Sequence, residues 1–175
     1  MRALLFNLLT SVLFLVAVTA FCVRRGLPFR ETLGLRAPTA VQALVWGALW
    51  IALIAASELV SRRMGMERPA PWTYPLPQIA LRVFGIVLLA PVAEELLFRG
   101  LLFHRLVAWS AVAAVLIPAV LFSVLHLQYS VPDMVLIFVD GVFLGIVRWA
   151  TGSTYLTIAM HVAGNLFAIS QRLMK

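Results

Sequence analysis

The chain has 175 residues, of which 63% are hydrophobic and 12% are charged. Soluble domains average about 45 to 50% apolar and about 25% charged residues, so this composition excludes an ordinary soluble domain. A mean hydropathy of +1.01 likewise excludes a disordered chain. At roughly 20 residues per crossing, we expect an all-α, polytopic membrane helix bundle of about six transmembrane helices. The expectation is a single integral membrane domain over 1–175, without an appended soluble domain.

The charge is unbalanced, with 14 basic and 7 acidic residues and a formal net charge of +7. The basic residues stand singly or in pairs between apolar runs, a pattern typical of loops that meet anionic lipid headgroups. They form no continuous stripe, so we expect membrane lipids as partners and no nucleic acid. The basic residues divide almost equally between the two sides of such a bundle and do not decide its orientation. The lone Cys22 can form no intrachain disulfide and is predicted to pack inside or face lipid.

The apolar segments follow one another in a regular order along the chain. The first, 3–23, is longer than the apolar core of a signal peptide, which favours a retained span over a leader cleaved after Val18-Thr19-Ala20. The linker 24–39 and the polar stretch 61–76 are predicted to lie at the membrane surface. Four ionisable residues near segment ends are predicted to be ordinary interface or capping residues: Glu58, Arg82, His104 and Asp133. The other predicted spans are 41–60, 78–103, 106–127, 131–149 and 153–169.

Two adjacent acids follow Pro91 in the third segment, where an ionisable side chain costs several kcal/mol by most estimates. Glu95 and Arg99 are four residues apart on one helix face, a spacing that favours an ion pair. Glu94 lies about 100° round the helix and is less directly neutralised. We therefore expect different roles for the two acids, one paired and structural and the other a base. Pro91 also tends to kink a helix, which would open room for water.

Two further polar clusters lie in later segments. His161 and Asn165 project from one helix face in the middle of the last segment, which favours a site over simple interhelical hydrogen bonding. His126, near the end of the fourth segment, is by itself more typical of an interface residue.

Asp140 is central in the fifth segment and is followed by a Gly141-x-x-x-Gly145 motif that predicts close helix packing. Two interpretations of Asp140 stand equal. It pairs with an arginine or a histidine, or it is protonated and only hydrogen-bonded.

Together these groups suit the activation of water for attack on a carbonyl carbon. Nucleophilic catalysis is disfavoured, because no Ser-His-Asp pattern and no Gly-x-Ser-x-Gly motif is present. The zinc-protease motif His-Glu-x-x-His is also absent. Even so, Glu94, His126 and His161 are candidate ligands for a divalent metal such as zinc. The residues leave open whether a metal or a carboxylate alone activates the water.

Three motifs, in this order, resemble one family. Glu-Glu-x-x-x-Arg at 94–99, Phe-x-x-x-His at 122–126 and His-x-x-x-Asn at 161–165 are similar to the motifs of the CPBP intramembrane proteases. That family includes the type II CAAX prenyl endopeptidases and the bacterial Abi proteins. The resemblance implies a catalytic motif region over 91–167.

The resemblance also implies a role for each motif residue. Glu94 and His126 activate water, His161 and Asn165 stabilise the oxyanion, and Glu95 and Arg99 support Glu94. We expect a glutamic-type or metal-dependent protease in the bacterial cytoplasmic membrane, cutting a membrane-associated protein or peptide near its C-terminus.

Two other classes remain as alternatives. One is a non-catalytic membrane immunity or scaffold protein that keeps the motifs for packing. The other is a small ion or proton carrier built on Glu94, Asp140 and His161, although the sequence has neither the repeat nor the paired half-helices typical of carriers.

Overall fold

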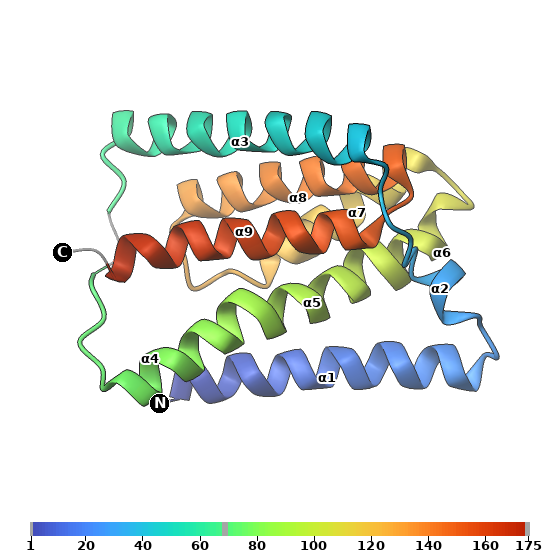
Figure 1. The fold of residues 1–175 in the computed structure, drawn as a ribbon, viewed down its shortest axis with the longest axis horizontal. Helices are drawn as coiled ribbons and strands as arrows, with labels where there is room; N and C mark the ends of the chain where they lie inside the picture. Colours follow the sequence, from blue (N-terminus) through green and yellow to red (C-terminus); the bar gives the residue numbers. More distant parts are fainter. Residues whose placement is uncertain (1, 68–69, 174–175) are drawn as a thin grey trace.

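The computed structural model describes residues 2–67 and 70–173, and every regular element in these ranges is a helix. The helices lie lengthwise in one bundle, and α1 begins at the same end of it as α9 finishes (Figure 1). This architecture confirms the predicted all-α membrane bundle. Its long elements are α1 (Arg2–Arg24), α3 (Ala40–Arg63), the continuous helix Leu76–Val107, α7 (Ala111–Val124), α8 (Val131–Thr151) and α9 (Thr154–Leu173).

Four of these helices are long and apolar enough to cross a bilayer: Leu4–Arg24, Ala40–Arg63, Leu76–Val107 and Val131–Thr151. The other two predicted spans differ from the expectation. The fourth predicted span, 106–127, is longer than the helix found there. Residues 106 and 107 end the preceding helix, and α7 has only 14 residues. The sixth is α9, which has 20 residues but a mean hydropathy too low for it to join these four helices.

The third predicted span is one continuous helix of changing width. It runs through α4 (Leu76–Val83), η1 (Phe84–Leu89), α5 (Ala90–Glu95), η2 (Leu96–Leu102) and α6 (Phe103–Val107), and both η stretches are π-helical. Pro91 has no N–H to donate, yet the chain stays helical through it, directly after a widened π turn. Because π-helical turns are frequent at functional sites, the two π-helical stretches on either side of α5 indicate that Glu94 and Glu95 belong to such a site.

The predicted close packing of the Gly141-x-x-x-Gly145 face is confirmed. A Cβ atom on Gly141 would lie 3.3 Å from the Cα atom of Ala119, and one on Gly145 would lie 3.2 Å from that of Val115. Small residues thus bring the backbones of α7 and α8 together, as in other membrane helix pairs.

The linker between α1 and α3 is not the simple surface segment that its turn residues predict. It contains the short helix α2 (Phe29–Thr32), and the Leu33 side chain is only 2% exposed. Thr154 ties the linker to the start of α9, because its N–H donates to the Gly34 carbonyl oxygen at 2.9 Å and its hydroxyl donates to the Leu33 carbonyl oxygen at 2.6 Å. The linker therefore closes one end of the bundle.

Helix α1 lies along one side of the bundle, next to the helix that contains α5 (Figure 1). Val18 and Cys22 are buried together with Leu33, so Cys22 is a packing residue and not lipid-facing. On the same helix, Phe14 contacts Phe98 edge to face with ring centroids 6.2 Å apart. The first predicted span thus supports the helix that carries the two acids.

The end residues follow the sequence predictions in part. Glu58 pairs with Arg62 at 2.7 Å, as expected of a residue that reaches the interface. Asp133 is not itself the cap of α8: the N-cap is Ser130, whose hydroxyl oxygen accepts from the Asp133 N–H and whose O–H donates to the Asp133 carboxylate at 2.6 Å. Arg82 differs, because it is buried and its guanidinium lies 4.1 Å from the ring centroid of Tyr74 instead of reaching out to solvent. The connection after α3 is shorter than the predicted 61–76, because 61–63 end α3 and Leu76 begins α4. Residues 68–69 in this connection lie outside the described residues.

Candidate active site

Glu95 is the centre of the polar network. Its side chain is fully buried, and one oxygen, Oε1, accepts a hydrogen bond from Arg99 at 2.8 Å and another from Nδ1 of His161 at 3.0 Å. The predicted Glu95–Arg99 ion pair is therefore present, and it joins α5 to α9 through His161. Removing one partner of a buried pair leaves the other charge uncompensated, so this network constrains the local fold.

Arg99 extends the network to two more helices. Its second terminal nitrogen donates to the Gly141 carbonyl oxygen in α8 at 3.0 Å, and its guanidinium carbon lies 5.0 Å from the ring centroid of Phe122 in α7. The side chain is 1% exposed. One arginine thus holds α5, η2, α7 and α8 in a fixed arrangement around the acids.

Glu94 has a different environment from its neighbour. Its side chain is 17% exposed, and its Oε2 lies 3.7 Å from Nε2 of His161, beyond hydrogen-bond distance. It makes no ion pair with an arginine in the part of the chain that the structure describes. The two adjacent acids therefore differ in partners and in exposure. Glu95, four residues before Arg99, is the paired acid, as the spacing predicts.

His126 lies beside this network without joining it directly. It follows the end of α7, and its Nδ1 bonds the Phe122 carbonyl oxygen at 2.8 Å. The Phe122 ring contacts both histidines, with centroid distances of 4.8 Å to His126 and 5.5 Å to His161. Among the described residues, His126 forms no hydrogen bond or ion pair with Glu94.

Asn165 holds α9 against the π-helical stretch before α5. Its amide nitrogen donates to the Ile86 carbonyl oxygen in η1 at 2.8 Å. One of its two amide hydrogens is used in this way, and the other remains for a further acceptor. Asn165 and His161 are both half-buried or buried on α9, on the side that faces α5 and η1.

Asp140 has a partner that the sequence did not predict. The indole Nε1 of Trp50 in α3 donates to its Oδ1 at 3.3 Å. Trp50 also covers Gly164 in α9, where a Cβ atom would lie 3.0 Å from the indole ring. Of the two interpretations of Asp140, only its hydrogen bonding is seen directly, and that bond attaches α3 to the rest of the site.

The three candidate metal ligands do not form one cluster in the described structure. In the described ranges no group of three His, Cys, Asp or Glu side chains is arranged to hold a metal ion. Glu94 lies 3.7 Å from Nε2 of His161, but His126 makes no hydrogen bond or ion pair with either of them in the described ranges. No catalytic step is therefore assigned to a metal.

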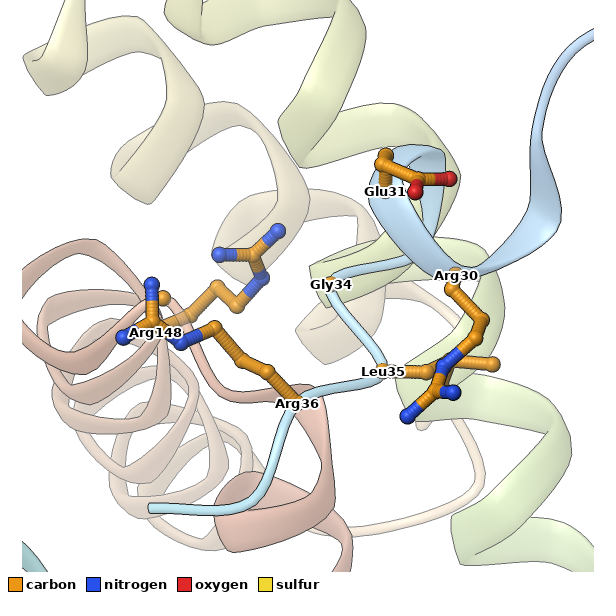
Figure 2. A pocket seen from close by; sticks show the side chains of 7 residues that line it. Arg30, Glu31, Gly34, Leu35, Arg36 and Arg148 are labelled. Atoms are coloured by element: carbon orange, nitrogen blue, oxygen red, sulfur yellow. The ribbon is translucent and has the colours of Figure 1, made fainter. Parts of the chain in front are cut away.

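Two open pockets lie at the ends of the bundle. The larger, of about 450 Å³, is formed by the linker and the end of α8 (Figure 2). The smaller, of about 300 Å³, lies between the ends of α3 and α9. Neither is lined by Glu94, Glu95, His126 or His161, so the acids are not reached through these two openings.

The fold and the site together define a helical membrane protein with a buried Glu-Arg-His network. The family model of the type II CAAX prenyl endopeptidase Rce1-like proteins matches residues 76–167, which is more than half of the chain. The chain therefore belongs to this family, as the three motifs indicate. The matched region contains all six predicted site residues: Glu94, Glu95, Arg99, His126, His161 and Asn165.

A relative from Escherichia coli, described as an uncharacterized 24.3 kDa protein, is 30% identical over 91 residues. The match covers 50% of this chain and 42% of that protein. The chain thus spans less than half the length of this curated relative. No solved structure matches the chain.

Proposed function

We propose that the chain is an intramembrane endopeptidase that hydrolyses a peptide bond, near the C-terminus, of a membrane-associated or membrane-anchored protein or peptide. The observation that carries the proposal is the unequal environment of the two acids: Glu95 is fully buried and paired, whereas Glu94 lies beside it without an arginine partner. Membership of the type II CAAX prenyl endopeptidase family supports the reaction class.

Glu94 acts as the general base in this proposal. Its carboxylate takes a proton from a water molecule, and the water oxygen attacks the carbonyl carbon of the peptide bond. When the C–N bond breaks, Glu94 returns the proton to the leaving nitrogen. The 17% exposure of its side chain leaves it an open side on which a water molecule can bind.

Glu95 and Arg99 position this base. The Glu95 carboxylate is hydrogen-bonded to Arg99 and His161, so it is a poor proton acceptor and serves to hold these two side chains in place. Arg99 also holds the Gly141 carbonyl, which fixes α8 relative to α5. The pair therefore orients α5 so that Glu94 faces the reacting group.

His126 and the α9 residues complete the proposed site. His126 assists Glu94 in holding the water through Nε2, since its Nδ1 is already bonded to Phe122. With its ring protonated, His161 donates from Nδ1 to Glu95 and has a second N–H, at Nε2, on the side of Glu94. Asn165 has one unused amide hydrogen. Donors of this kind stabilise the negative oxygen of a tetrahedral intermediate.

The setting of the reaction is also a proposal. We place the protein in the bacterial cytoplasmic membrane, which the Escherichia coli relative supports, with membrane lipids and a membrane-associated peptide as partners and no nucleic acid. The catalytic motif region is 91–167, within one integral membrane domain over 1–175.

A survey of peptide termini in membranes tests the function. Host cells express the wild type, Glu94→Gln or Glu67→Gln at matched levels, and the new termini in each membrane fraction are identified by mass spectrometry. Glu67 is an exposed loop carboxylate that is not one of the proposed site residues, so Glu67→Gln controls for the change from acid to amide. New termini with the wild type and with Glu67→Gln, but not with Glu94→Gln, are expected.

The same survey separates the alternatives. A scaffold or immunity protein that keeps the motifs for packing gives the same termini with all three chains. A proton carrier also gives no new termini, but it changes proton flux when reconstituted in vesicles, and Glu94→Gln removes that change. Either pattern would contradict the protease.

A further inference from the structure

The larger pocket lies at the end of the bundle formed by the linker and the turn between α8 and α9, and its wall is basic. It is lined by three arginines and one acid, together with two glycines and a leucine (Figure 2). The arginines are Arg30, Arg36 and Arg148. None of the groups assigned to the reaction lines this pocket, so its charge needs a separate explanation.

Arg148 is the most deeply placed of the three arginines. It lies in the last turn of α8 and is 8% exposed. Its Nε donates to the Arg99 carbonyl oxygen at 2.9 Å, and its guanidinium carbon lies 5.0 Å from the ring centroid of Phe103. Its two terminal nitrogens make no hydrogen bond to another described residue. A side chain more than nine-tenths buried therefore presents free donors to the pocket.

No carboxylate within the described ranges neutralises this charge. Arg148 and Arg36 form no ion pair there, and the two guanidinium groups repel each other. Glu31 is the acid of the pocket, but its carboxylate points away from both arginines (Figure 2). A buried charge is costly unless it is paired, so the site lacks a negative partner.

The backbone is shaped around these two side chains. Gly34 and Gly152 have positive φ angles of 61° and 66°, which other residues adopt only with strain. A Cβ atom on Gly34 would overlap the Arg148 guanidinium, and one on Gly152 would lie 3.1 Å from a terminal nitrogen of Arg36. Each arginine thus lies against a bare stretch of backbone that a larger residue would obstruct.

We propose that Arg148 and Arg36 bind a phosphate-type anion in this pocket. Guanidinium groups match the geometry of phosphate oxygens and form two parallel hydrogen bonds with them. The pocket lies at the ends of membrane-spanning helices, and the neighbouring Trp149 is 59% exposed, as in the aromatic belt near lipid headgroups. Both the phosphodiester of a phospholipid headgroup and free inorganic phosphate have this chemistry.

Binding would also stabilise the active-site region. Arg148 holds the Arg99 carbonyl oxygen, and Arg99 in turn pairs with Glu95. An anion on Arg148 therefore favours the arrangement in which the linker, α8 and η2 are joined. The binding itself does not depend on the proposed protease activity, and its test does not use activity.

The test measures binding to the full chain purified in detergent. Phosphatidylglycerol and phosphatidylcholine are titrated in turn, and the bound lipids are counted by native mass spectrometry. A second arm exchanges chloride for inorganic phosphate at constant ionic strength and follows thermal unfolding. The chains compared are the wild type, Arg36→Gln and Arg24→Gln. Arg36 and Arg24 are both exposed at this end of the bundle, but Arg24 lies outside the pocket, so the pair separates the pocket from general surface charge.

We expect Arg36→Gln to weaken phosphatidylglycerol binding about tenfold, as for the loss of hydrogen bonds to a charged group, with Arg24→Gln close to the wild type. A lipid effect identifies the headgroup as the source of the phosphate. Stabilisation of the wild type by inorganic phosphate, lost in Arg36→Gln, identifies free phosphate instead. The proposal is overturned if neither arm distinguishes Arg36→Gln from the wild type, or if Arg24→Gln loses as much. Arg148→Lys keeps the positive charge but loses the planar guanidinium. It should therefore weaken binding of the lipid or of inorganic phosphate, whichever of the two the wild type binds.

Discussion

Nδ1 of His161 lies 3.0 Å from Oε1 of Glu95, although 66 positions separate the two residues in the chain. The same oxygen also accepts from Arg99, so a single carboxylate oxygen joins α5, η2 and α9. The other imidazole nitrogen, Nε2, faces Glu94 instead. His161 therefore touches both acids with different atoms, and this arrangement explains how two adjacent glutamates have separate roles.

Exchanging each acid for its amide should separate structure from catalysis. Glu95→Gln leaves Arg99 as an uncompensated buried charge and should lower the free energy of unfolding by about 3–5 kcal/mol. Glu94→Gln, at a side chain without an arginine partner, should unfold close to the wild type and lose cleavage. Thermal unfolding in detergent and the terminus survey are measured on both variants. Equal loss of stability in the two variants would refute the assignment.

Arg99→Ala should lose both folding and activity. The change leaves Glu95 buried without its main partner and removes the bond to the Gly141 carbonyl, at a cost of about 3–5 kcal/mol. Arg63→Ala is the control, because Arg63 is an exposed arginine at the end of α3. The measurements are the yield of monodisperse protein and its unfolding temperature. An Arg99→Ala protein as stable as Arg63→Ala would show that the buried pair does not hold the fold.

The two histidines should differ in their effect on stability. His126→Ala removes one hydrogen bond to the Phe122 carbonyl, which is worth about 1 kcal/mol. His161→Ala removes a donor to the buried Glu95 carboxylate, a loss of about 1–3 kcal/mol. Both should abolish cleavage. Unfolding curves combined with the terminus survey check this order, and normal cleavage by either variant would exclude that histidine from the reaction.

The spacing of residues along one helix carried most of what the sequence could predict. Glu95 and Arg99 are four residues apart on one helix, so their pairing follows from helix geometry alone. The Gly141-x-x-x-Gly145 face follows from the same geometry, because small side chains allow close approach. Within the described ranges, the helical bundle and the ion pair at its centre are thus properties of local sequence.

Contacts between distant segments were not predictable in this way. Trp50 lies in the middle of an apolar run, and nothing in that run points to Asp140, 90 residues further on. Arg148 looks like a basic residue at a helix end, yet it is buried because the linker folds back over it. The linker itself has the composition of a surface turn, and its burial depends on the bonds from Thr154. Such contacts depend on how helices are arranged, which no local pattern contains.

The two linker glycines offer a matched test of that packing. Gly26 and Gly34 have nearly equal φ angles, 59° and 61°, so an alanine at either position should cost about 1–2 kcal/mol in backbone strain. At Gly26 nothing lies within 4 Å of a new Cβ atom, whereas at Gly34 it would overlap the Arg148 guanidinium.

Gly34→Ala should therefore lose about 1–3 kcal/mol more than Gly26→Ala, the usual cost of overpacking a filled site. Thermal unfolding of the two variants, side by side in one detergent, measures the difference. Since the backbone term is common to both, any excess in Gly34→Ala reports the contact with Arg148. Equal losses would mean that the linker does not pack on Arg148 in the folded protein, and the anion pocket would lose one of its walls.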